Sequence, residues 1–200
     1  MSKRVFDLVL ALGGLVVFSP FLVIFGLWIK IDSPGPIFFR QERVGRGGVP
    51  FQILKLRTMQ LNAEKSGRLT IGDDSRVTRA GRFLRRHKLD EFPQLMNVVL
   101  GSMSLVGPRP EVKEYFEFYP PDARRAMLSL RPGIAAPNSL MLFNESHILG
   151  HSADPRRTYI SEIIPIKADC VLQYERDNSL VDDLKVILRT LRKVGESFVK

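Results

Sequence analysis

The chain has 200 residues, about the length of one domain, and its hydrophobic content of 44% excludes a disordered chain. Its net charge of +9 predicts an anionic partner: nucleic acid, a phosphate-bearing substrate or an acidic membrane surface. The single cysteine, Cys170, excludes an internal disulfide framework and is typical of a reducing compartment.

The first predicted element is an apolar run over residues 5–29, interrupted near its centre by Ser19 and Pro20. About 20 apolar residues suffice to cross a bilayer, so a spanning helix is one interpretation. Pro20 removes one intrahelical hydrogen bond, and Ser19 can bond to the carbonyl groups left free, so a helix break is tolerable in lipid. A signal peptide fits poorly, because the run is too long and no small-residue cleavage site follows it.

The charges that flank this run bear on its topology. Lys3 and Arg4 precede it, and Lys30 follows it. Cytoplasmic flanks carry an excess of Lys and Arg, so the two ends compete in a single crossing. A re-entrant hairpin, with Ser19 and Pro20 as its helix break, places both ends in the cytoplasm. From the residues alone, the spanning helix and the hairpin both stay open.

Beyond this run the composition is that of a soluble, basic domain. A short strand is predicted over residues 37–40, and a second one within residues 49–59. Lys55 and Arg57 alternate in the second strand and therefore share one face.

A helix is predicted over residues 76–88, because Asp73, Asp74 and Ser75 before it are typical helix-start residues. Three arginines recur along one side of this helix: Arg79, Arg82 and Arg86. They form either a solvated basic face or a contact surface for phosphate or anionic lipid.

A second helix is predicted from the apolar residues Leu89, Phe92, Leu95, Met96 and Val99, which recur at helical spacing until Gly101 ends the pattern. Asp90 is predicted as its N-cap and Glu91 in its first turn, where the helix dipole favours ionised carboxylates and attracts phosphate. Capping alone would also explain such a pair. Residues 103–106 are predicted as a strand, after which the sequence GPRP holds Arg109 in a rigid turn suited to bidentate phosphate binding.

The sequences SPGPIFFRQERVG, KLRTM, LDEFPQLMNVVLGSMSLVGPRP and RPGI together resemble the bacterial sugar transferase family, the small form of the monotopic phosphoglycosyl transferases. The resemblance implies an α/β fold that is mostly α. Residues 1–30 would form the re-entrant membrane helix. Residues 31–200 would form a catalytic domain that lies, with amphipathic interfacial helices, on the cytoplasmic face of the bacterial inner membrane.

The activity implied by the resemblance is transfer of a phospho-sugar from a UDP-sugar to polyprenyl (undecaprenyl) phosphate. UMP leaves, and a polyprenyl diphosphate sugar forms through a covalent aspartyl intermediate. This is the first membrane step of a bacterial glycan such as an exopolysaccharide, capsule, O-antigen or glycoprotein. Anionic lipids are further expected partners, and a homodimer is left open.

The resemblance also implies roles for individual residues. Asp90 matches the catalytic aspartate, and Glu91 matches its partner, which is associated with Mg²⁺. Lys55 and Arg109 match positions at the active site, and Arg57 is predicted to bind substrate phosphate beside Lys55. Asp169 matches a further acidic site residue more loosely.

Two other functions are weighed against this one. A membrane-anchored basic binding module would use the same charge, but no helix-turn-helix, RNA-recognition or zinc pattern occurs, so no nucleic-acid partner is expected. A membrane-anchored glycosyltransferase would release UDP instead of UMP. The sequence does not name the sugar or the pathway, and residues 135–146 depart from the family's common pattern. The tail from Ser179 is amphipathic and either packs on the core or lies on anionic lipid.

Overall fold

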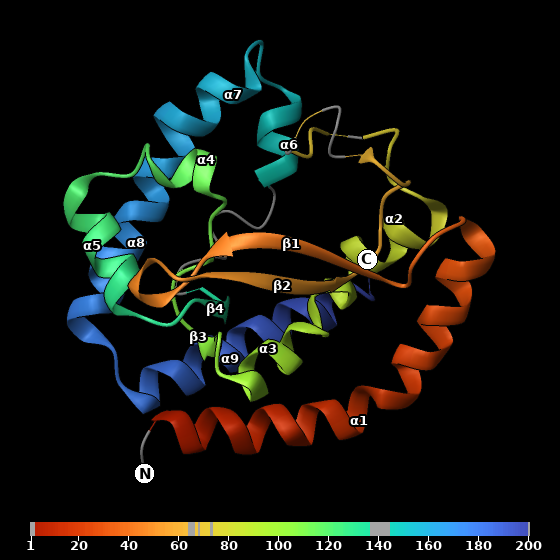
Figure 1. Cartoon of the computed structure of the whole chain (residues 1–200), viewed down its shortest axis with the longest axis horizontal. Helices are drawn as coiled ribbons and strands as arrows, with labels where there is room; N and C mark the ends of the chain where they lie inside the picture. The colour runs from red at the N-terminus through yellow and green to blue at the C-terminus, as the bar shows by residue number, and fades with distance from the viewer. Residues whose placement is uncertain (1–2, 64–66, 68, 73, 137–144, 200) are drawn as a thin grey trace.

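The structure is a computed structural model that describes residues 3–63, 67, 69–72, 74–136 and 145–199 (Figure 1). It is mostly helical with two small sheets, which confirms the predicted fold class at that level. The helices are α1 (Lys3–Asp32), α2 (Arg79–Arg86), α3 (Gln94–Leu100), α4 (Lys113–Phe116), α5 (Pro121–Ser129), α6 (Glu145–Gly150), α7 (Pro155–Thr158), α8 (Ile164–Asp177) and α9 (Leu180–Glu196). The strands are β1 (Phe38–Val44), β2 (Pro50–Leu56), β3 (Ser104–Val106) and β4 (Gly133–Ala135). Short 3₁₀ turns cover Arg46–Gly48 and Leu89–Glu91, and a π-helical turn covers Tyr159–Ile163.

Helix α1 is continuous over Lys3–Asp32 and contains Pro20. In Figure 1 it runs along the lower edge of the molecule and then bends upward, so that its two arms border two sides. Proline is a usual cause of such bends, because its ring displaces the carbonyl one turn earlier. That carbonyl belongs to Val16 and accepts a hydrogen bond from the Ser19 hydroxyl at 2.9 Å. The predicted compensation by Ser19 is therefore confirmed, while the predicted break is a bend within one helix.

Within the part of the chain that the structure describes, α1 is the helix whose length and composition suit a membrane span. Most of its apolar side chains are exposed, including Val16, Val23 and Ile31. Its few buried residues lie near its two ends: Asp7 and Ala11, then Gly26 and Ile29. Near the bend, Phe18 stacks on Phe92 with ring centroids 3.5 Å apart, so α1 packs on the rest of the chain there as well as near its two ends.

Strands β1 and β2 form an antiparallel hairpin that crosses the middle of the molecule in Figure 1. Phe39 pairs with Lys55 in the register of this hairpin. The first strand is longer than predicted, since cross-strand pairing continues to Val44 opposite Pro50. Ile53 and Leu56 are both buried but belong to different core clusters, because side chains three residues apart in a strand point to opposite faces.

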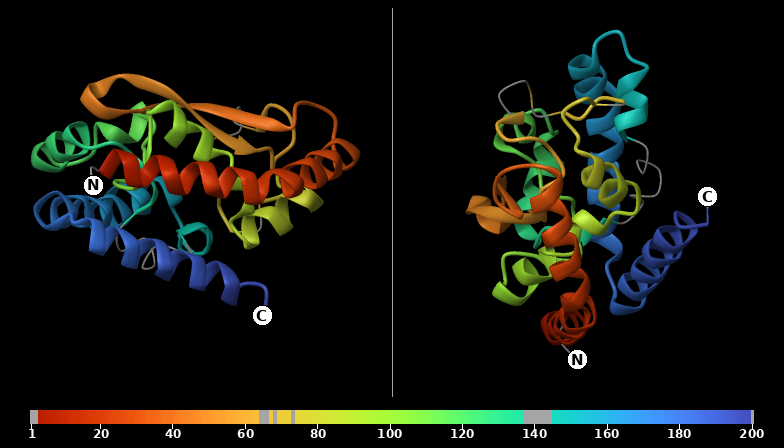
Figure 2. Two further views of the ribbon diagram at one scale, coloured as in Figure 1. Left: turned by 90° about the horizontal axis from the view of Figure 1, so that it is seen from below. Right: turned by 90° about the vertical axis from the view of Figure 1, so that its right-hand side faces the viewer.

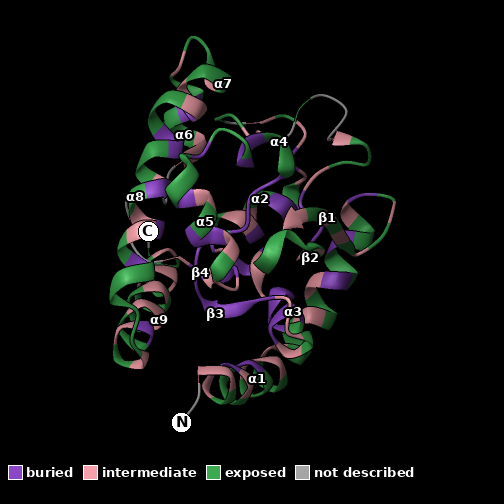
Figure 3. Cartoon of the chain, turned by 60° about the vertical axis from the view of Figure 1, so that its left-hand side comes forward, coloured by how far each residue is buried: buried purple, intermediate pink, exposed green. Residues whose placement is uncertain are grey.

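Strands β3 and β4 form a short parallel pair at the centre of the fold. The predicted strand over residues 103–106 is thereby confirmed as Ser104–Val106. Figure 3 shows buried residues gathered on β3, β4 and the neighbouring part of α3, with exposed residues along α1, α7 and α9. The central core is therefore built from β3 and β4, with α3 packed between them and α1.

Helix α2 begins later than predicted, at Arg79, and Thr78 caps it by accepting a hydrogen bond from the Gly81 amide at 3.0 Å. Asp74 instead accepts three hydrogen bonds from the Arg76 guanidinium and so belongs to the preceding loop. Asp73 lies outside the described residues. The arginines predicted along one side of this helix, Arg79, Arg82 and Arg86, are all exposed.

Helix α9 lies beside the first arm of α1, and both are in view when the molecule is seen from below (Figure 2). An ion pair between Lys3 and Asp183 ties the two first turns together, and the Asp183 carboxylate also accepts a hydrogen bond from the Tyr174 hydroxyl at 2.8 Å. Only Asp183 is buried in α9, while Val181, Leu184 and Leu188 are exposed. The predicted amphipathic tail is therefore a helix that docks by its first turn and by Val186 and Ile187, which pack against the central core, and that leaves an apolar stripe exposed.

Candidate active site

The Asp–Glu pair lies in a tight 3₁₀ turn and not at the start of an α-helix. The turn covers Leu89–Glu91 and follows Lys88, whose φ of 55° is left-handed. Helix α3 begins only after Pro93, at Gln94. The predicted N-cap position of Asp90 is therefore wrong. Pro93 has no N–H to donate, so an α-helical hydrogen bond cannot form at that point.

Glu91 is held between two cations that come from distant parts of the chain. The Lys55 ammonium lies 2.8 Å from Glu91 Oε1. The Arg109 guanidinium donates to both carboxylate oxygens, to Oε1 and, at 3.3 Å, to Oε2. Bidentate pairs of this kind fix direction as well as distance. The structure thus brings together four of the predicted site residues: Lys55, Asp90, Glu91 and Arg109.

The side chain of Asn97 holds strand β2 against helix α3, which follows the acidic turn. Its Oδ1 accepts a hydrogen bond from the Leu54 amide at 3.0 Å, and its Nδ2 donates to the Gln52 carbonyl at 2.8 Å. Asn97 is buried, so both bonds are shielded from water. Lys55 follows Leu54 directly, and its ammonium is thereby placed at Glu91.

The turn that carries Arg109 is fixed by a close crossing of two backbones. The Gly107 amide donates to the Ala135 carbonyl at 3.1 Å, and the Gly133 amide donates to the Pro108 carbonyl at 2.8 Å. A Cβ atom on Gly133 would lie only 2.1 Å from the Gly107 nitrogen, which no side chain could tolerate. The glycines of the GPRP and RPGI sequences therefore serve this crossing, which places Arg109 beside the acidic turn.

The two carboxylates of the site differ in their pKa shifts. Burial acts to raise the pKa of Glu91, but the charges of Arg109 and Lys55 outweigh it and hold that pKa well below its usual value. Burial raises the pKa of Asp90, and the neighbouring Glu91 charge adds to this, while Lys55 acts against it. Glu91 is therefore the fixed anion of the pair, and Asp90 is the carboxylate whose charge is poorly stabilised without a further cation or ligand.

A cavity of about 1050 Å³ opens over this pair. Its charged lining consists of Asp90 and Glu91 against nine cations, although only some of these present their charge to it. The cations are Lys30, Arg40, Arg43, Lys55, Arg57, Arg76, Arg85, Lys88 and Arg109. Such an excess of positive charge attracts polyanionic ligands such as diphosphates, and the volume is at the upper end for small-molecule sites.

Arg57 borders the cavity, but its guanidinium has other partners. Its three nitrogens donate to the carbonyl oxygens of Ser33, Pro34 and Pro36, in the turn that follows α1. Arg57 is buried, and these bonds occupy its fork of donors. This placement does not favour the predicted phosphate contact of Arg57 and assigns it to holding the end of α1.

Three other predictions lie away from the cavity or outside the described residues. Asp169 is exposed on α8 and does not line the cavity, so the structure does not bring this residue to the site. Ser19 and Pro20 are exposed at the bend of α1. Of the atypical segment 135–146, residues 137–144 lie outside the described residues.

Sequence reasoning missed Arg85 and Lys88, two further cations that face Asp90. Both line the cavity, and both charges act to lower the pKa of Asp90. The run RRHK directly before LDE was a usable signal, because it places positive charge next to the acidic pair. Asn97 gave no such signal, since its partners on β2 become neighbours only in the folded chain.

The acidic pair offers the hard oxygen ligands that Mg²⁺ prefers, and this ion is usually held by one or two carboxylates together with substrate phosphates. Among the described residues, no group of three or more His, Cys, Asp and Glu side chains could hold a metal. Both oxygens of Glu91 already have cationic partners. The residues present therefore fit a magnesium ion whose ligands are completed by phosphate, and the predicted Mg²⁺ stays a prediction.

Comparison with known proteins agrees with these features. The family model described as bacterial sugar transferase matches residues 1–197. This chain belongs to the bacterial sugar transferase family. The resemblance drawn from the sequence motifs is thereby confirmed, and the match includes both α1 and the acidic turn.

Several curated relatives are similar over nearly the whole chain. The UDP-glucose:undecaprenyl-phosphate glucose-1-phosphate transferase of Caulobacter vibrioides is 41% identical over 96% of this chain and 68% of its own length. The corresponding Escherichia coli protein is 36% identical over 96% of this chain. The UDP-N-acetylgalactosamine-undecaprenyl-phosphate N-acetylgalactosaminephosphotransferase of Aeromonas hydrophila is 34% identical over 98% of this chain. The chain spans only 40% and 44% of the lengths of these last two proteins.

Proposed function

We propose that this chain transfers a phospho-sugar from a UDP-sugar to undecaprenyl phosphate, with release of UMP. The observation that carries the proposal is an acidic pair beneath a cavity with a large excess of positive charge, in which Asp90 is buried and Glu91 is clamped by Lys55 and Arg109. Both proposed substrates carry phosphate groups. The similar proteins of this family are named for different sugars, glucose and N-acetylgalactosamine. The identity of the sugar is therefore left out of the proposal.

Asp90 is the nucleophile in this proposal. Its carboxylate oxygen attacks the sugar-bearing phosphorus of the donor, and the bond from that phosphorus to the bridging oxygen breaks, so that UMP leaves. A phosphate oxygen of the lipid then attacks the same phosphorus, which frees Asp90 and yields the lipid diphosphate sugar. Attack requires ionised Asp90, and the nearby charges of Lys55, Arg85 and Lys88 support that form.

Glu91, Lys55 and Arg109 act around the transferring group. Charge accumulates on the phosphoryl oxygens during transfer, and cations fixed in advance stabilise it without reorganisation. Because Glu91 holds both cations in place, an arriving diphosphate meets a preset arrangement. Mg²⁺ held by the acidic pair and the diphosphate would neutralise charge on the departing UMP.

Helix α1 is proposed to be re-entrant, with both of its ends on the cytoplasmic side. At its first turn, the Arg4 guanidinium donates to the carbonyls of Val98 and Val99. At its last turn, the Asp32 carboxylate accepts a hydrogen bond from the Ala80 amide at 2.9 Å. Both ends therefore bind the same domain, which one straight crossing does not permit. Residues 5–18 would rise about 21 Å as a helix, short of the roughly 30 Å of hydrocarbon in a bilayer.

Helix α9 is proposed to lie on anionic lipid beside α1. Its exposed apolar residues recur at helical spacing, at Val181, Leu184, Leu188 and Leu191. Basic residues border this stripe: Lys185, Arg189 and Arg192. An amphipathic helix with such a composition is typical of the membrane interface.

The activity is tested by incubating the full chain in lipid nanodiscs with undecaprenyl phosphate, Mg²⁺ and a panel of UDP-sugars. UMP is expected with at least one sugar, whereas UDP would indicate plain glycosyl transfer. Without lipid acceptor, intact-protein mass spectrometry should find one phospho-sugar adduct, absent from Asp90→Asn. Turnover without any adduct would favour direct attack by the lipid phosphate. Activity that survives EDTA would remove Mg²⁺ from the scheme.

A further inference from the structure

Another buried carboxylate, Glu111, lies two residues after Arg109 and does not line the cavity. We infer that Glu111 is a positioning residue for the proposed reaction: it fixes the turn of Arg109, so that the guanidinium meets Glu91 and the transferring phosphate. This inference rests on the proposed function. It assigns a role to a network of charges that the proposed chemistry does not otherwise use.

The Glu111 carboxylate gathers partners from several elements. Its Oε1 accepts a hydrogen bond from the Val112 amide at 3.0 Å and lies 3.5 Å from the Arg43 guanidinium of β1. Its Oε2 accepts hydrogen bonds from the Tyr159 hydroxyl at 2.7 Å and the Tyr119 hydroxyl at 3.3 Å. One side chain thereby joins β1, the start of α4 and the π-helical turn before α8.

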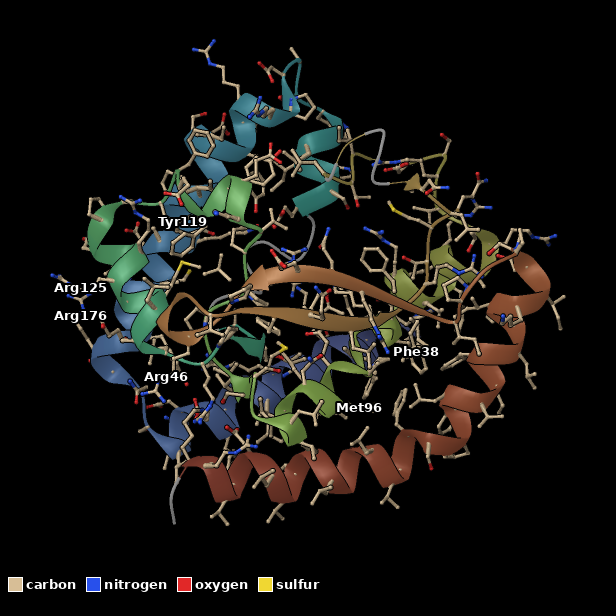
Figure 4. All side chains as sticks on the ribbon, viewed as in Figure 1. Phe38, Arg46, Met96, Tyr119, Arg125 and Arg176 are labelled. Atoms are coloured by element: carbon tan, nitrogen blue, oxygen red, sulfur yellow. The ribbon has the colours of Figure 1, made fainter. Side chains whose placement is uncertain are left out.

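A further layer of contacts surrounds these partners. The Lys167 ammonium of α8 lies 3.8 Å from Glu111 Oε2 and donates to the Tyr159 hydroxyl at 2.7 Å. It also pairs with Glu145 of α6 at 3.0 Å. Tyr119 lies beside α5 and α8 in Figure 4, where it belongs to the core cluster formed with these helices. Each of these groups is backed by another, so the Glu111 carboxylate has little freedom to move.

The Arg109 turn is anchored to this network on one side and to β4 on the other. The Glu111 carbonyl accepts a hydrogen bond from the Val44 amide at 2.9 Å, and Arg43 donates to the Pro110 carbonyl at 3.0 Å. The Gly133 amide holds Pro108 from the opposite side. Arg109 lies between two prolines and is anchored on both sides, so its backbone conformation is fixed. Its long side chain then reaches Glu91.

Glu111 also allows two arginines to lie close to each other. Arg43 and Arg109 both line the cavity, and the Arg43 Nε atom is buried without a hydrogen-bond partner among the described residues. Burial lowers the pKa of Arg43, Glu111 acts to raise it, and the charge of Arg109 lowers it further. Without the Glu111 charge, Arg43 would repel Arg109, and the guanidinium would turn away from Glu91.

A double-mutant cycle separates positioning from plain structural support. Glu111→Gln is measured alone and combined with Arg109→Ala, in nanodiscs, as kcat and KM for UMP release. Glu111→Gln is expected to lower kcat about tenfold to a hundredfold, as misplacement of a catalytic group does. KM for the donor should change little. In the Arg109→Ala background the same substitution should have almost no further effect on kcat, because the group it positions is gone.

Asp183→Asn serves as the matched control. Asp183 is an equally buried carboxylate, with an ammonium and a tyrosine hydroxyl as partners, but it contacts α1 and α8 and not the Arg109 turn. Asp183→Asn should lower the melting temperature. It should also change kcat by the same factor in the wild-type and the Arg109→Ala backgrounds, because the two sites are independent. Tyr159→Phe removes the 2.7 Å hydrogen bond to Glu111, together with the one that Lys167 donates to the same hydroxyl, and should show a weaker form of the Glu111→Gln pattern.

The inference is overturned if Glu111→Gln lowers kcat by the same factor with and without Arg109. If Glu111→Gln does not fold, the same comparison made with Tyr159→Phe decides. Equal factors for that variant in both backgrounds also overturn the inference. Wild-type protein that releases no UMP with any donor would instead remove the proposed function, which is a separate failure.

Discussion

Two carboxylates of this protein, Glu91 and Glu111, have similar surroundings and different expected roles. Each is bound to an arginine and lies near a lysine: Arg109 and Lys55 for Glu91, Arg43 and Lys167 for Glu111. Glu91 borders a cavity of about 1050 Å³, whereas Glu111 is enclosed by tyrosines and backbone. The comparison teaches that burial and ion pairing do not identify a catalytic carboxylate. Access to a ligand does.

The largest effect should come from Asp90→Asn, on the open side of this comparison. Loss of the nucleophile is expected to lower kcat for UMP release by about a thousandfold or more. The amide keeps the shape of the side chain, so the folded state should persist, as checked by thermal unfolding. A variant that retained more than about a tenth of wild-type turnover, a loss under about 1.4 kcal/mol, would contradict the assignment of Asp90.

The next largest losses of kcat should come from Arg109→Ala and Lys55→Ala. Each removes a preset cation at the transferring phosphate, for which losses of about a hundredfold to a thousandfold in kcat are usual. Arg109→Lys should recover little of this, because an ammonium cannot replace the two bonds that the guanidinium donates to Glu91. Substantial recovery by lysine would mean that the charge of Arg109 matters and its direction does not.

The sequence predicted the residues of the candidate site better than it predicted the local structure around them. The residues predicted to carry the chemistry are in short motifs, and the structure brings them together: Lys55, Asp90, Glu91 and Arg109. The predicted N-cap for Asp90 was wrong because a left-handed residue and a proline make a tight turn that periodicity does not reveal. The bend of α1 was readable, since both its cause and its compensating hydroxyl are local.

Arg57 shows why the other contacts around the site could not be predicted from the sequence. Its alternation with Lys55 predicted a shared face, but its guanidinium turns to three carbonyls in the turn before β1. Partners that are backbone atoms leave no trace in side-chain patterns. The same holds for Asn97, whose bonds to β2 position Lys55.

Arg57→Ala should therefore affect stability more than catalysis. Loss of hydrogen bonds from a buried guanidinium to three carbonyls is expected to lower the free energy of unfolding by about 2–4 kcal/mol. The kcat of the remaining folded protein should fall far less than in Lys55→Ala, which changes a residue only two positions earlier in the chain. Denaturant unfolding and UMP release, measured on the same preparations, check both parts. A kcat loss that matched Lys55→Ala at unchanged stability would restore the predicted phosphate contact.

The smallest effect should be on the melting temperature. Neutralising Asp90 and neutralising Glu91, the two carboxylates of the acidic turn, should change it in opposite directions at pH 7. The pKa of Asp90 is raised above its ordinary 3.8 by burial, so its folded state favours the protonated form. Its contribution to stability is then fully present below pH 3.8 and is lost as the pH rises through the folded pKa. Asp90→Asn, which is always neutral, should therefore raise the melting temperature at pH 7, and this gain should vanish in acid.

Glu91→Gln should do the opposite at pH 7. The pKa of Glu91 lies well below its ordinary 4.5, so its ion pairs stabilise the folded state above pH 4.5, and that contribution is lost as the pH falls through the folded pKa. Removing the charge leaves Lys55 and Arg109 without their carboxylate, and the melting temperature should fall. Thermal unfolding of both variants and the wild type at a series of pH values tests the pair. If Asp90→Asn lowered the melting temperature as Glu91→Gln does, Asp90 would be a second anion that stabilises the fold. The charge that the proposed nucleophile needs would then not destabilise the folded state at pH 7.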